Sequence, residues 1–154
     1  MNETPAQKSV VNRSLRLKLA IAVAGWLIFV LGVNPGLFGM DRSPVVGFVQ
    51  IATFLVGLGI ICLGGYISLA ALWNGAPKSI ASDIGLRLVS TGYVIAVACG
   101  MADVFGFGSN NYPLIPIFGI YQKIGVIIGE VVIAVGLVML VPFKKPKPQI
   151  GELQ

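Results

Sequence analysis

Four runs of apolar residues, each close to the length needed to cross a membrane, constrain this chain more than any other feature. The runs cover roughly residues 17–33, 44–73, 84–105 and 117–141. A membrane-spanning helix needs about 20 predominantly apolar residues. The sequence therefore predicts an all-α integral membrane protein, in which one transmembrane domain at residues 17–142 forms an antiparallel, up-down four-helix bundle.

The composition supports this interpretation. Apolar residue types make up 56% of the chain and charged types 11%, whereas soluble proteins carry about 25% charged residues. The mean hydropathy of +0.89 agrees with this. Because polar groups are too few to cover the apolar surface, we expect the lipid bilayer to cover it. We expect no nucleic-acid partner despite the net charge of +5, because the basic residues cluster at the ends of the apolar runs.

The distribution of lysine and arginine predicts the orientation in the membrane. Two of these residues lie toward the outer side, Arg42 in a loop and Lys123 just inside the fourth helix. The other nine lie on the side of both tails: Lys8, Arg13, Arg16, Lys18, Lys78, Arg87, Lys144, Lys145 and Lys147. Positively charged segments stay in the cytoplasm, so the N-terminal tail (1–16) and the C-terminal tail (143–154) are expected there. With the small size and short loops, this predicts a protein of a bacterial inner membrane.

The first apolar run has an alternative interpretation as a cleaved signal peptide. A basic segment precedes it, but the sequence "GVNPG" at its end is a poor cleavage site. We therefore expect an uncleaved first helix. At the other boundaries, Ser82 or Asp83 is a candidate cap for the third helix, and Pro142 closes the fourth.

Three of the four helices carry a line of small or weakly polar residues on one face, and the first helix has only a candidate line. Such faces favour close packing between membrane helices. The residues that share a face are Ala22, Gly25, Phe29 and Gly32; Gln50, Thr53, Gly57, Gly64, Ser68 and Ala71; Gly85, Gly92, Ala96, Cys99 and Asp103; and Gly125, Gly129 and Gly136. These lines predict packing within the bundle, and the alternative is that one of them docks against another subunit. On the second helix, Phe48, Tyr66 and Trp73 fall on the opposite face, which we expect to contact lipid.

Glu130 lies inside the fourth apolar run, roughly 20 Å from its start at 1.5 Å per residue. An acidic side chain at the centre of the bilayer costs on the order of 3 kcal/mol. Glu130 points about 120° away from the glycine line of its own helix, and Lys123 points the same way. We expect a protonated Glu130 that donates to a backbone carbonyl, or a Glu130 that pairs with Lys123.

A second polar group is expected in the outer half of the membrane. Asp103 lies near the end of the third helix and Lys123 near the start of the fourth, with a short loop between them. We predict an Asp103–Lys123 ion pair or hydrogen bond, and Gln50 and Thr53 are candidates to complete the cluster.

The inventory of reactive residues argues against an enzyme. Histidine is absent, and the two cysteines, Cys62 and Cys99, both fall inside apolar runs. We expect these cysteines to be buried, inert thiols, and the sequence leaves a disulfide between them open. We expect no metal, no cofactor and no catalytic residue, because no nucleophile–base pair or phosphate-binding loop is present.

Two functions remain. The first is a non-catalytic accessory, assembly or scaffold subunit of a membrane complex, working as a homodimer or in a larger complex. The alternative is a small proton- or cation-coupled transporter, dimeric, that uses Glu130, because ionisable groups inside a membrane often mark ion pathways. An enzyme acting on lipid or quinone is disfavoured, because Asp103 and Glu130 lie too far apart in depth to act together.

Overall fold

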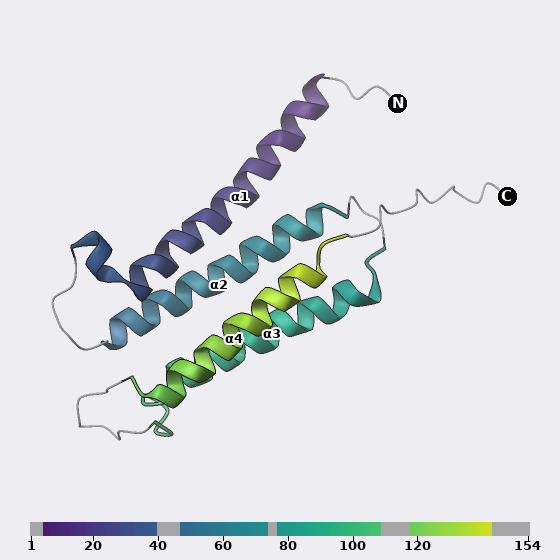
Figure 1. The fold of residues 1–154 in the computed structure, drawn as a ribbon. Helices are drawn as coiled ribbons and strands as arrows, with labels where there is room; N and C mark the ends of the chain where they lie inside the picture. Colours follow the sequence, from purple (N-terminus) through teal and green to yellow (C-terminus); the bar gives the residue numbers. More distant parts are fainter. Residues whose placement is uncertain (1–4, 40–46, 74–76, 109–117, 143–154) are drawn as a thin grey trace.

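The computed structural model describes residues 5–39, 47–73, 77–108 and 118–142, and side chains from Arg16 onward. Four α-helices and one short 3₁₀ helix make up this part of the chain, and no strand occurs in it (Figure 1). The elements are α1 (Pro5–Val33), η1 (Pro35–Phe38), α2 (Phe48–Ala71), α3 (Ile80–Gly100) and α4 (Ile120–Met139).

All four α-helices are long and apolar enough to cross a membrane. The qualifying segments are Arg16–Val33, Phe48–Ala71, Ile80–Gly100 and Ile120–Met139, with mean hydropathies of 1.9, 2.1, 1.4 and 1.9. At most 33% of any of these segments is buried inside the protein. Most of the apolar surface of these helices is therefore exposed, which is unfavourable in water and favourable in lipid. The structure indicates a multi-pass membrane protein.

Two helix boundaries differ from the sequence-based expectations. Helix α1 begins at Pro5 rather than at residue 17, so helix also covers most of the predicted N-terminal tail. Helix α3 begins at Ile80, and its cap is Ser79, whose Oγ accepts a hydrogen bond from the Ser82 N–H at 3.2 Å. The prediction of Ser82 or Asp83 as the cap was wrong, because both lie within the first turn of the helix.

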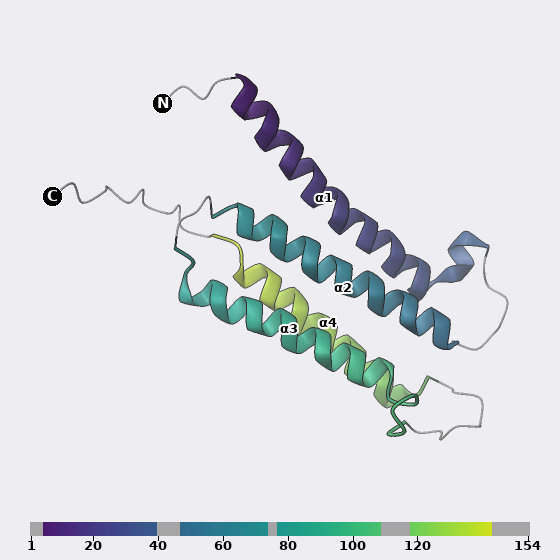
Figure 2. The ribbon, with the colours of Figure 1, turned by 180° about the vertical axis from the view of Figure 1, so that it is seen from behind.

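The helices associate as an N-terminal pair, α1 with α2, and a C-terminal pair, α3 with α4 (Figures 1 and 2). Glycines bring each pair into backbone contact. A methyl group placed on Gly92 would lie 2.6 Å from the carbonyl oxygen of Gly129, and one on Gly129 would lie 2.7 Å from that of Gly92. In the N-terminal pair, Gly57 lies against the backbone of Phe29 in the same way. Only residues without a β-carbon allow backbones to approach this closely.

The two pairs meet mainly through α2, and larger side chains make these contacts. Tyr93 of α3 lies against Gly59, and Leu137 of α4 lies against Gly65. The buried core follows the same helix: Ile51, Phe54, Leu55, Leu58 and Cys62 of α2 join Val89, Ala96, Val126, Ile133 and Leu140.

Trp73, which follows α2, ties the two pairs together at one end of the bundle. Its side chain is 7% exposed, and its indole N–H donates to the carbonyl oxygen of Leu140 at 3.0 Å. The expectation that Trp73 faces lipid was therefore wrong. The physical reason is that Leu140 caps the C-terminal end of α4, where helix carbonyls lack partners within the helix, and a buried indole needs an acceptor.

Candidate functional site

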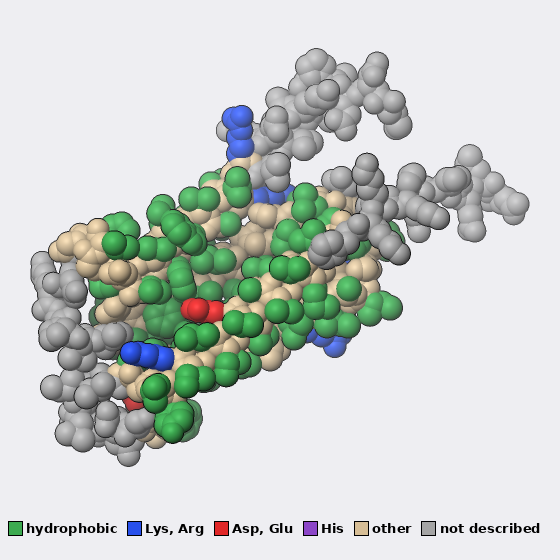
Figure 3. Space-filling view, viewed as in Figure 1, with side chains coloured by type: hydrophobic (Ala, Val, Ile, Leu, Met, Phe, Trp, Pro, Cys, Tyr) green, Lys and Arg blue, Asp and Glu red, His purple; other side chains and the backbone are tan. Residues whose placement is uncertain are grey.

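A cavity of about 450 Å³ lies between the two helix pairs, and Glu130 is part of its lining. Residues of α1, α2 and α4, together with Phe118 just before α4, form its walls. The lining residues are Phe29, Gly32, Val33, Gln50, Phe54, Phe118, Lys123, Val126, Ile127 and Glu130. Figure 3 shows acidic side-chain atoms exposed on a face that is otherwise mostly hydrophobic, between the upper and lower helices. Of the five polar candidates from the sequence, the cavity brings together Glu130, Lys123 and Gln50.

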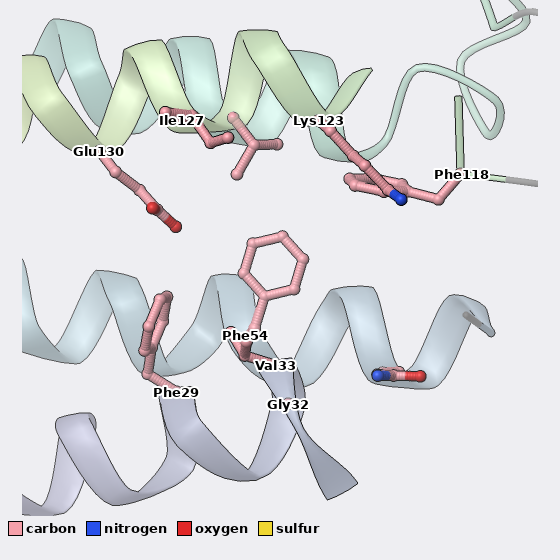
Figure 4. Close-up of a pocket in the computed structure, with 10 residues that line it drawn as sticks. Phe29, Gly32, Val33, Phe54, Phe118, Lys123, Ile127 and Glu130 are labelled. Atoms are coloured by element: carbon pink, nitrogen blue, oxygen red, sulfur yellow. The ribbon is translucent and has the colours of Figure 1, made fainter. Parts of the chain in front are cut away.

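Glu130 and Lys123 both project into this cavity from α4 (Figure 4). They are seven residues apart in sequence, which is a rise of about 10 Å along the helix. Both side chains lean toward the N-terminal end of α4, as helical side chains do, so leaning does not bring their charged groups together. The only ion pair among the described side chains is Arg87–Asp83, at 3.2 Å on the surface. The expected Glu130–Lys123 pair is therefore wrong.

The carboxyl group of Glu130 also has no hydrogen-bond partner among the described residues. In Figure 4 the Phe29 and Phe54 rings lie across the cavity from it, and Ile127 lies on its own helix. The expectation that Glu130 donates to a backbone carbonyl is not met, because α4 holds its own carbonyls in helical bonds and the facing walls are side chains. The result is a carboxyl group, half-buried, that ends in open space.

The predicted Asp103–Lys123 pair is wrong as well. The glycine line of α4 packs on α3, with Gly129 against Ala96. Lys123 shares the face of Glu130, about 120° away from that line, and so points toward α1 and α2 instead. Asp103 lies in the turn after α3, where its carboxylate contacts Gly108, and its Oδ1 is buried without a partner.

Gln50 and Thr53 take different roles. Gln50 lines the cavity from α2. Thr53 instead donates its hydroxyl hydrogen to the Val49 carbonyl at 2.7 Å, within its own helix. Its hydroxyl is therefore already satisfied, and it is not among the residues that line the cavity.

The small residues singled out in the sequence lie between helices of this chain. Gly57 and Gly64 of α2 lie against Phe29 and Ala22 of α1. On the other pair, Gly136 lies against Gly85 and Val89, and Gly125 lies against the Cys99 sulfur. Ala96, at the centre of α3, is fully buried. Because the chain's own helices occupy these faces, they are not free for another subunit.

A second cavity, of about 560 Å³, lies between α2 and α3 and is lined by Gly59, Cys62, Leu63, Tyr66, Leu86, Val89, Ser90, Tyr93 and Val94. Its hydroxyl groups already have partners. Tyr93 donates to the Leu55 carbonyl at 3.4 Å, Ser90 donates to the Leu86 carbonyl at 3.1 Å, and the Lys78 ammonium donates to the Tyr66 hydroxyl at 3.1 Å. It contains no acidic side chain, so the Glu130 cavity is the stronger candidate site.

Sequence reasoning missed the aromatic walls of the Glu130 cavity. Phe29 and Phe54 meet edge to face, with ring centroids 6.2 Å apart and an interplanar angle of 89°. Phe29 lies on the candidate packing line of the first helix, so the sequence contained a signal for one of them. The sequence also left a disulfide open, but Cys62 and Cys99 are both free.

Comparison with known proteins adds no assignment. A scan against protein-family models, a search of curated proteins and a search of solved structures all find no match. The chemistry of the cavity is therefore the remaining indication of function.

Proposed function

We propose that this protein is a small proton- or cation-coupled transporter that uses Glu130. The observation that carries the proposal is the carboxyl group of Glu130, which ends in a cavity within a membrane-length helix bundle and has no partner among the described residues. Ionisable residues at such depth are costly, and where they occur they commonly serve ion pathways.

The proposed arrangement in the membrane is antiparallel and up-down, with both termini in the cytoplasm of a bacterial cell. Its support is the order of contacts within each pair: Ala22 meets Gly64 and Phe29 meets Gly57, so residue numbers rise in one helix as they fall in the other. The positive charge of both tails adds to this support.

We propose that the mouth of the cavity is the end lined by Lys123 and Gln50, near the ends of α4 and α2 that face outward in this orientation. Glu130 lies ten residues into α4, or about 15 Å, which is half the thickness of the hydrocarbon core. A proton or cation entering from outside thus meets Glu130 near the midplane.

For a proton or cation to reach the cytoplasmic side, the cavity must close toward the outer surface and open toward the cytoplasm. Each helix pair is held by backbone contacts at glycines, whereas flexible side chains such as Leu137 make the contacts between the pairs. We infer that the pairs move as rigid units against each other, as the repeats of other transporters do. A homodimer would cover the open side of the cavity.

The test is flux through liposomes that contain the purified protein. With potassium and valinomycin present to balance the charge, a proton gradient should drive a pH change inside the vesicles, and Glu130→Gln should abolish that change. Asp103→Asn is the matched control, because Asp103 is an acidic residue outside the cavity, and it should keep the wild-type rate. Equal flux in wild type and Glu130→Gln would exclude the proposed role of Glu130.

An accessory, assembly or scaffold subunit is the second candidate. The observation that favours it is the open interface between the two pairs, which a partner helix could cover. Purification in nanodiscs decides between the two, because a stoichiometric partner protein supports the subunit and a homodimer with Glu130-dependent flux supports the transporter.

A further inference from the structure

The chemistry around Glu130 also indicates what the cavity binds. The carboxyl group offers a negative charge or a hydrogen-bond acceptor, and nothing in the described protein uses it. Across from it lie the Phe29 and Phe54 rings (Figure 4). Aromatic rings attract positive charge at their faces, and more strongly away from water. An acid and two aromatic rings around an apolar space complement a positively charged, apolar molecule.

We propose that the cavity binds a lipophilic monovalent cation, with its positive group beside Glu130 and its apolar body against Phe29 and Phe54. This inference rests on the proposed function and names its substrate class. The cavity volume of about 450 Å³ lies in the range for drug-sized ligands. A transmembrane helix, which is about 10 Å wide, is too large to enter such a space.

Binding of the cation exchanges with a proton on Glu130. An isolated carboxylate in an apolar cavity is unfavourable, so Glu130 holds a proton while the cavity contains no cation. A cation beside it stabilises the carboxylate, and the proton leaves to water through the mouth near Gln50. Lys123 is the only other charged group on the described lining, because α1 and α2 contribute no titratable side chain to it. One cation enters and one proton leaves, so the charge in the cavity is unchanged.

Lys123 sets the selectivity for a single positive charge. Its position about 10 Å along α4 from Glu130 disfavours any second positive group at the mouth. At that separation and an effective dielectric constant of about 20, the repulsion weakens binding roughly tenfold for a second positive charge, which no departing proton offsets. A dication that spans the cavity is therefore a poorer ligand than a monocation.

Titration calorimetry of the full-length protein in detergent tests this inference with two probes of the same shape. Tetraphenylphosphonium is a permanent cation without a proton to release, and tetraphenylborate is its anionic counterpart. We expect tetraphenylphosphonium to bind more tightly. Its affinity should fall tenfold for each unit of decreasing pH while Glu130 is protonated, and buffers of different ionisation enthalpy should report one proton released per cation.

Four variants identify the residues responsible. Glu130→Gln should weaken tetraphenylphosphonium binding at least tenfold and remove its pH dependence, whereas Glu130→Asp should keep both. Asp103→Asn should bind like wild type. Lys123→Met should bind tetraphenylphosphonium as wild type does while Glu130 is protonated, because Lys123 repels the entering cation and the departing proton equally, and it should bind a dication roughly tenfold more tightly. Gel filtration checks that each variant is folded. If Glu130→Gln is not folded, the pH series and the comparison of the two probes on the wild-type protein test the inference instead.

Two results would overturn the inference. The first is tighter binding of tetraphenylborate than of tetraphenylphosphonium, which would mean that Lys123 recruits an anion. The second is an unchanged affinity of folded Glu130→Gln for tetraphenylphosphonium. A failure of the proposed transport function can be distinguished from a failure of this ligand assignment. Proton-releasing binding without flux in liposomes keeps the ligand assignment and removes the transporter. Glu130-dependent proton flux without tetraphenylphosphonium binding keeps the transporter and removes the ligand class.

Discussion

Replacing Gly92 by alanine tests whether backbone contact holds the C-terminal pair together. The added methyl group would lie 2.6 Å from the Gly129 carbonyl oxygen and 2.9 Å from the Ile133 backbone nitrogen, whereas ordinary contacts begin at 3.4 Å. Helices α3 and α4 must therefore separate by about 0.8 Å, the shortfall at the closer atom, because backbone atoms cannot rotate away. Overpacking of this kind costs about 1–3 kcal/mol.

Gly65→Ala is the matched control. It lies inside α2, and the nearest atom to its added methyl group is Leu137 Cδ2 at 3.0 Å, the flexible end of a side chain. Both substitutions gain similar helix propensity, up to about 1 kcal/mol, so the difference between them isolates the clash. In reversible unfolding in micelles we expect Gly92→Ala to be less stable than Gly65→Ala by about 1–3 kcal/mol.

A double variant sharpens this test. Gly92 and Gly129 each face the other's carbonyl oxygen, so a separation forced by one methyl group makes room for the other. We expect Gly92→Ala with Gly129→Ala to cost less than the sum of the single changes. Stabilities of Gly92→Ala and Gly65→Ala within about 0.5 kcal/mol of each other would refute the close-contact account.

Three further changes follow from individual contacts. Trp73→Phe removes the hydrogen bond to the Leu140 carbonyl and should lower stability in micelles by about 1 kcal/mol; an unchanged unfolding midpoint would contradict that bond. Ser79→Ala should cost about 1 kcal/mol through the lost cap of α3, whereas Ser82→Ala, whose buried hydroxyl has no partner, should not destabilise; the reverse order would restore Ser82 as the cap. Reversing the charges of Asp103 and Lys123 together should be no better tolerated than the sum of the single reversals, since coupling above about 0.5 kcal/mol in a double-mutant cycle would indicate contact.

The lengths of the apolar runs located the four helices, and periodicity located the packing faces, because those faces depend on spacing along one helix. The apolar runs matched the membrane-length segments, and small residues on one face, such as Gly92 and Gly129, lie where two backbones meet. The direction of Glu130 relative to its glycine line could also be calculated from 100° per residue.

What the sequence could not provide was the identity of the neighbour on each face. The Asp103–Lys123 prediction assumed that the charged face of α4 meets α3, but the glycine face of α4 takes that position. The aromatic side chains opposite Glu130 come from α1 and α2, and only the arrangement of the two pairs brings Phe54 and Glu130 to one cavity. Trp73 was misjudged for the same reason, because its acceptor belongs to Leu140, 67 residues away.

Determining on which side of the membrane each chain end lies tests the central claim most directly. Fluorescent and alkaline phosphatase reporters fused to each end, in turn, in a bacterial host show whether that end lies in the cytoplasm. Four crossings with positively charged tails predict fluorescence and no phosphatase activity at both ends. Phosphatase activity at one end, or recovery of the protein in the soluble fraction without detergent, would contradict the four-helix membrane account and the depth assigned to Glu130.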